Sequence, residues 1–73
     1  MGAIEIYKTN VKNKTAAKKI LAEIVSKQPH YCCNFDLDDC DKVLRIENAS
    51  GRIDNDLIFE ILENNNHEGA ILE

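Results

Sequence analysis

The residues of this chain best suited to chemistry are its three cysteines and a group of lysines in its first 28 residues. Cys32 and Cys33 are adjacent, and Cys40 follows in a later polar segment. Soft thiolate ligands favour Cu(I) and Zn(II), so an adjacent cysteine pair suggests a metal site. Lysines carry compact positive charges that would instead attract an acidic surface. The lysines in question are Lys8, Lys12, Lys14, Lys18, Lys19 and Lys27.

The cysteine pair lies in a segment with the alternation of a β-strand. Cys33 lies on the same face of the predicted strand as Phe35 and Leu37, so it is predicted to be a small buried side chain. Successive strand side chains point to opposite faces, so Cys32 is predicted as an exposed thiol on the open face. Cys40 is predicted in a hairpin turn, roughly 25 Å from Cys32. Because these positions do not bring the thiols together in a regular strand, metal binding is only the alternative to a role in protein interaction. In that alternative, Cys32 binds Cu(I) or Zn(II) with Cys33 or with the Cys32 of a second copy.

The elements that would position these residues follow from periodicity and from helix-capping residues. Strands are predicted over residues 4–7, 32–37, 42–47 and 70–72, with helices over 14–28 and between 54 and 64. Asn13 and Asp54 are suitable N-caps, and Pro29 ends the first helix. Ile4 and Ile6 alternate with more polar residues, as in a half-buried strand. The order strand-helix-strand-strand-helix-strand predicts an α+β, ferredoxin-like sandwich, with an antiparallel sheet and two helices on one face.

The loop before the first helix carries a family resemblance. The order of elements over residues 1–73 resembles the heavy-metal-associated domain of copper chaperones, in which an M-x-C-x-x-C motif fills this loop. Here Asn13 and Ala16 occupy the two cysteine positions. The resemblance implies a single heavy-metal-associated-like domain that lacks the usual metal ligands. It also implies that the domain docks on an acidic protein partner through four lysines, Lys12, Lys14, Lys18 and Lys19.

The distribution of charge supports oriented association with such a partner. The first 28 residues carry six lysines and two acidic residues, whereas the remainder carries three basic and eleven acidic residues. Such asymmetry steers a charged partner to one side of a domain. The net charge of −4 opposes attraction to nucleic acid. Only Tyr7 and Tyr31 are predicted as exposed rings on which bases could stack.

Several other classes of function are disfavoured by the sequence. No nucleophile–base pair or glycine-rich phosphate loop is evident, so the chain is predicted not to be an enzyme. No segment approaches the ~18 apolar residues of a membrane span, and an odd number of cysteines favours reduced thiols in the cytoplasm. A run of acidic residues is interpreted as a solvated turn rather than a calcium site; it comprises Asp36, Asp38, Asp39 and Asp41. We therefore predict a protein-interaction module without a cofactor, as a monomer or weak dimer.

Overall fold

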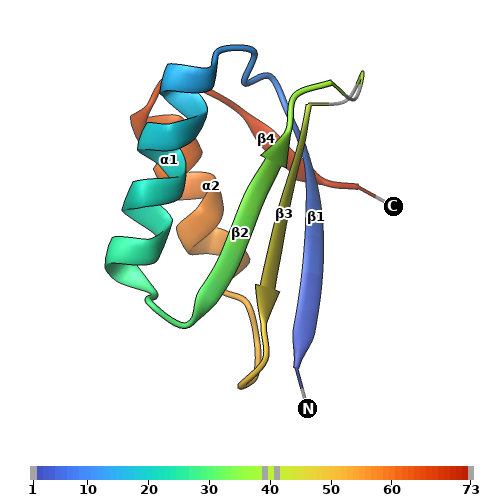
Figure 1. Ribbon diagram of the computed structural model, residues 1–73, viewed down its shortest axis with the longest axis vertical. Helices are drawn as coiled ribbons and strands as arrows, with labels where there is room; N and C mark the ends of the chain where they lie inside the picture. Colours follow the sequence, from blue (N-terminus) through green and yellow to red (C-terminus); the bar gives the residue numbers. More distant parts are fainter. Residues whose placement is uncertain (1, 39, 41, 73) are drawn as a thin grey trace.

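The predicted order of elements is confirmed by a computed structural model that describes residues 2–38, 40 and 42–72. The elements are β1 (Ala3–Thr9), α1 (Lys14–Lys27), β2 (Tyr31–Asp36), β3 (Val43–Asn48), α2 (Asn55–Asn64) and β4 (Gly69–Ile71). The strands form one antiparallel sheet in the order β2-β3-β1-β4, and both helices lie on the same side of it (Figure 1). This is the predicted α+β, ferredoxin-like arrangement.

Both helices begin at the predicted capping residues. The Asn13 side chain accepts hydrogen bonds from the backbone N–H groups of Thr15 at 2.7 Å and Ala16 at 3.3 Å. The Asp54 side chain accepts one from the N–H of Leu57 at 3.1 Å. These bonds satisfy first-turn amides that have no partner within the helix. The cap at Asn13 therefore fixes where α1 starts, and with it the place of every lysine on that helix.

The hydrophobic core lies between the sheet and the two helices. Apolar side chains at helical spacing bury one stripe of α1 and one of α2, as the periodicity predicts. The core residues are Tyr7, Val11, Ala17, Ile20, Ile24, Tyr31, Leu44, Ile46, Ile58, Ile61 and Leu62. In the part of the chain that the structure describes, no helix has both the length and the apolar character needed to cross a membrane.

The exposure expected for the two tyrosines is wrong. Tyr7 is 0% and Tyr31 6% exposed, whereas Ile4 is 50% and Ile6 38% exposed. Antiparallel pairing sets Tyr7 opposite the buried Leu44, and opposite residues share one face of a sheet. The inner face of β1 therefore carries the tyrosine, and the isoleucines lie on the open face.

Hydrogen bonds to α2 and its cap explain why both tyrosines are tolerated in the core. The Tyr7 hydroxyl donates to Oδ1 of Asn55, and Nδ2 of Asn55 donates to the half-buried Glu5 carboxylate at 3.3 Å. The Tyr31 hydroxyl accepts from the N–H of Asp54 at 2.9 Å. A tyrosine ring can fill a core when its hydroxyl finds a partner there.

A second group of hydrogen bonds ties the loop after β1 to the β2–β3 connection. Thr9 is buried, and its hydroxyl donates to the carbonyl of Lys42 at 2.6 Å and accepts from the N–H of Val11 at 3.2 Å. The Lys42 ammonium donates to the carbonyl of Leu37 at 2.9 Å. These bonds anchor Leu37, the first residue after β2, next to the end of the sheet where α1 begins. Asp39 and Asp41, from the predicted acidic turn, lie outside the described residues.

Candidate functional site

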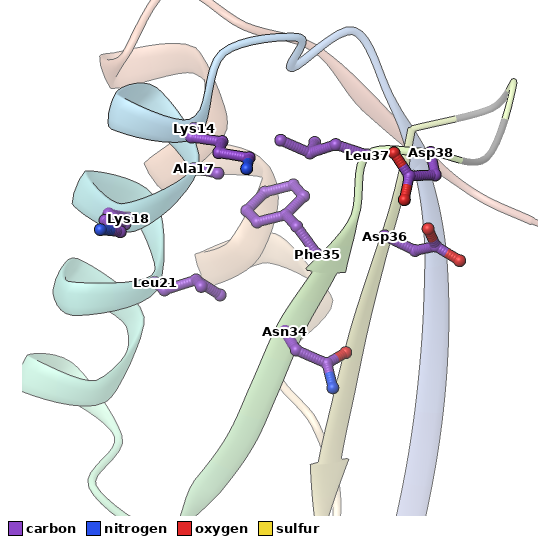
Figure 2. A pocket seen from close by; sticks show the side chains of 9 residues that line it. All are labelled: Lys14, Ala17, Lys18, Leu21, Asn34, Phe35, Asp36, Leu37 and Asp38. Atoms are coloured by element: carbon purple, nitrogen blue, oxygen red, sulfur yellow. The ribbon is translucent and has the colours of Figure 1, made fainter.

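A groove of about 370 Å³ lies between α1 and the edge strand β2 (Figure 2). We call it the α1–β2 groove. Its helical side is formed by Lys14, Ala17, Lys18 and Leu21. Its other side is formed by Asn34, Phe35, Asp36, Leu37 and Asp38, from β2 and the residues that follow it. The groove therefore joins segments that are separated in the sequence by the second half of α1 and the turn after it.

The inner surface of the α1–β2 groove is apolar. Figure 2 shows the Phe35 ring projecting from β2 toward α1, while the Asn34 and Asp36 side chains point away from the helix. Leu21, Phe35 and Leu37 are half-buried and pack against the core. Their remaining exposed area is available to an apolar group of a ligand, which would gain about 25 cal/mol for each Å² removed from water.

Two of the four predicted partner-binding lysines line this groove. Lys14 and Lys18 are exposed and four residues apart on α1, so they occupy the same side of the helix. Figure 2 shows the Lys14 side chain directed toward the Phe35 ring. At about 100° per residue, Lys19 is rotated by about 140° from Lys14 and stands outside the groove. Lys12 is exposed in the preceding loop and does not line the groove either.

Cys32 and Cys33 lie on opposite faces of β2, as the alternation predicts. Cys32 is exposed and pairs with Glu47, whereas Cys33 is half-buried and pairs with the buried Ile46. Burial raises the pKa of the Cys33 thiol, and the neighbouring Cys32 raises it further. A raised pKa leaves less thiolate, the form that binds metals. Among the described residues, no three His, Cys, Asp or Glu side chains are grouped so that they could hold a metal ion.

We expect the reduced protein to show no tight one-to-one uptake of Cu(I), because the Cys32 and Cys33 side chains cannot reach one ion from opposite faces of a regular strand. The measurement is an anaerobic titration against a competing chelator of known affinity, with a Cys32→Ser variant as the control. Tight uptake that the variant loses would contradict this expectation and establish the alternative thiolate site.

The α1–β2 groove itself was not predicted from the sequence, although most of its residues were placed correctly. The alternation of the strand placed Phe35 and Leu37 together on the face directed at the helices. Leu21 was assigned to the apolar stripe of α1. The helical position of Leu21, three residues after Lys18, was the one available signal that an apolar surface adjoins the lysines. Its significance depends on how α1 lies relative to β2, which is a tertiary property.

The fold and the site define a small ferredoxin-like domain with an apolar groove, bordered by lysines, beside an edge strand. Comparisons with protein-family models, with curated proteins and with solved structures find no match to this chain. Ferredoxin-like arrangements host many unrelated functions, so the fold alone assigns none. A functional assignment must therefore rest on the side chains of the groove.

Proposed function

We propose that this domain is a non-enzymatic protein-interaction module that binds an acidic segment of a partner protein in the α1–β2 groove. One observation carries the proposal: Lys14 and Lys18 border an apolar surface formed by Leu21 and Phe35. Burial of apolar groups supplies affinity, and complementary charge supplies orientation and a faster association. The proposal keeps the acidic partner implied by the resemblance to heavy-metal-associated domains, and narrows the predicted docking surface from the first loop and helix to the side of the helix that borders the groove.

The charges around the groove favour one orientation of an acidic ligand. The lysines stand on the helical side, whereas Asp36 and Asp38 belong to the side formed by β2. Acidic groups of the ligand are therefore attracted toward α1 and repelled from the β2–β3 connection. An exposed lysine–carboxylate pair contributes about 0.2–1 kcal/mol, so the apolar contact must supply most of the affinity. The lysines chiefly select which apolar segment binds.

Reversing the two groove lysines is expected to weaken binding about tenfold. The test selects binders to the immobilised domain from a displayed library of random peptides, and measures their affinities for a Lys14→Glu/Lys18→Glu variant. Two lost attractions replaced by repulsions amount to roughly 1.4 kcal/mol, which corresponds to that factor. The selected peptides are expected to combine acidic and apolar residues, and their affinities to fall as salt is added.

A Lys19→Glu/Lys27→Glu variant is the matched control. It changes the net charge by the same amount as the Lys14→Glu/Lys18→Glu variant and on the same helix. Both positions are exposed and lie outside the groove. Its affinity for the selected peptides is expected to change less than about twofold, since screening in salt weakens distant charges. Equal losses in the two variants, or a selection that enriches no acidic peptide, would exclude the groove as the binding site.

A further inference from the structure

The strand that borders the α1–β2 groove is an edge strand. Within the described residues, β2 has β3 as its only strand neighbour, because the sheet order is β2-β3-β1-β4. β2 is six residues long and contains neither proline nor lysine. Natural edge strands are commonly protected from strand pairing by such residues, by bulges or by short length. β2 therefore retains the ability to pair with a further strand.

The backbone groups at the outer edge of β2 can be identified from one hydrogen bond. The N–H of Tyr31 donates to the carbonyl of Gln28 at 3.0 Å, so it points away from β3. In an antiparallel pair, residues alternate between those that bond to the neighbouring strand and those that do not. The N–H and C=O groups of Cys33 and Phe35 therefore also point to the outer edge. The side chains of these two residues face the helices.

The spacing of the groove lysines matches that of a strand laid along this edge. Lys14 and Lys18 are separated by about 6 Å along the axis of α1, at 1.5 Å per residue. Side chains on one face of a strand recur every two residues, about 6.6–6.8 Å. Two acidic side chains on the helix-facing side of an added strand could thus each lie near one lysine. The next helix-facing side chain would lie beyond Lys18, near Leu21, which lines the groove.

We propose that the α1–β2 groove binds its partner by strand addition: an extended acidic segment pairs antiparallel with the free edge of β2, next to α1. This proposal rests on the proposed function and specifies the conformation of the partner segment, an extended strand. The helix-facing residues of the segment are acidic, acidic and apolar, in the direction in which α1 runs. Its backbone exchanges hydrogen bonds with Cys33 and Phe35, and its acidic side chains contact Lys14 and Lys18. Main-chain bonds then add to the affinity that the apolar contact supplies, and the side chains of the groove select which segment binds.

The opposite edge of the sheet lacks this combination. β4 has only three residues and pairs with β1 over Tyr7–Thr9. The second groove near that edge is lined by polar and small residues, together with one acidic side chain: Lys8, Thr9, Asn10, Glu68, Gly69 and Ala70. That groove offers no large apolar side chain as an anchor site. A neighbouring groove contains Phe59, but it is bordered by Glu63 and Glu68, whose carboxylates would repel an acidic segment. A free strand edge, two lysines and an apolar surface are therefore found together at β2, and these are what an acidic segment with an apolar residue needs for binding.

The test uses a synthetic peptide and two methylated forms of it. The peptide has blocked ends and the order threonine, glutamate, threonine, glutamate, threonine, phenylalanine, threonine. In the proposed pairing, the glutamate and phenylalanine N–H groups face β2, and the threonine N–H groups point away from it. One form carries N-methyl groups on both glutamates, and the other carries them on the second and third threonines. Affinities are measured by NMR titration of the full chain, together with the exchange rates of its backbone amides.

Methylation of the two glutamates is expected to weaken binding at least tenfold, because it removes two main-chain donors and blocks close approach. Methylation of the two threonines is expected to weaken it less than threefold. Binding of the unmodified peptide should slow amide exchange at Cys33 and Phe35. Equal effects of the two methylated forms, or unchanged exchange at those amides, would overturn strand addition. The proposed function would survive if binding still weakened in the Lys14→Glu/Lys18→Glu variant.

Two further outcomes also decide the question. If peptides from the random library bind in the groove but the synthetic peptide does not bind at millimolar concentration, the proposed pattern is wrong and the proposed function stands. Slow exchange at Cys33 and Phe35 that depends on protein concentration, without peptide, would mean that a second copy of the chain pairs with β2. That result would also overturn the proposal.

Discussion

Replacing Ile46 with alanine is expected to lower the free energy of unfolding by about 2–5 kcal/mol, whereas the same change at Ile4 costs less than about 1 kcal/mol. Ile46 is 0% exposed on the interior strand β3, and Ile4 is 50% exposed on the open face of β1. The first change leaves a cavity in the core, and the second removes atoms that are already partly in water. Urea unfolding of both variants measures the difference.

This pair of variants tests which face of β1 is buried. A domain of this size has a total stability near the lower end of about 5–15 kcal/mol, so the Ile46→Ala variant would lose a large share of it. If Ile4→Ala were as destabilising as Ile46→Ala, the isoleucines of β1 would have to face the core. Tyr7 would then be exposed, and the register of β1 against β3 would be wrong.

Above about pH 10 the protein is expected to lose up to about 1.4 kcal/mol of stability per pH unit through Tyr7 alone. Burial raises the pKa of the Tyr7 hydroxyl, and the charges of Glu5, Tyr31 and Asp54 raise it further. The unfolded chain releases this proton near pH 10, while the folded protein keeps it. The unfolded state then binds fewer protons than the folded state, so stability is full below about pH 10 and falls as pH rises.

A Tyr7→Phe variant isolates this effect. Near neutral pH it is expected to be less stable by about 1–2 kcal/mol, because Oδ1 of the half-buried Asn55 loses its hydrogen-bond donor. Between about pH 10 and pH 12 its stability should fall less steeply than that of the unmodified protein. Urea unfolding at several pH values gives the slope of stability against pH for each protein. Both proteins contain the same cysteines, so ionisation of the thiols affects the two slopes equally. Parallel slopes would mean that Tyr7 ionises equally readily in the folded and unfolded states.

The two predictions concern the same structural feature, the inner face of β1. Tyr7, the Asn55 side chain and Glu5 form a chain of hydrogen bonds that connects β1 to the first turn of α2. That connection holds α2 against the sheet on one side of the core, while α1 packs against β2 on the other. The position of α1 next to β2 is what forms the groove, so core stability and the candidate binding site depend on the same packing.

The order of the elements and the starts of both helices could be predicted from the sequence, because they depend on local interactions, whereas the predicted ends of the strands differ from those observed by one or two residues. Asn13 and Asp54 cap the helices through bonds to residues two or three positions away. The spacing of apolar residues identified the helical stripes, and alternation placed Cys32 and Cys33 on opposite faces of their strand. From this order of elements, the ferredoxin-like arrangement followed.

Two features depend on tertiary packing: which face of β1 is buried, and which lysines lie on one surface. In β1 both alternating sets include residues able to enter a core, and the choice depends on pairing with Leu44 and on a partner from α2 for the Tyr7 hydroxyl. Lys14 and Lys18 meet Phe35 only because α1 packs against the edge of β2. Contacts between residues distant in the chain leave no periodic signal, so the groove could be identified only once the helices were packed on the sheet.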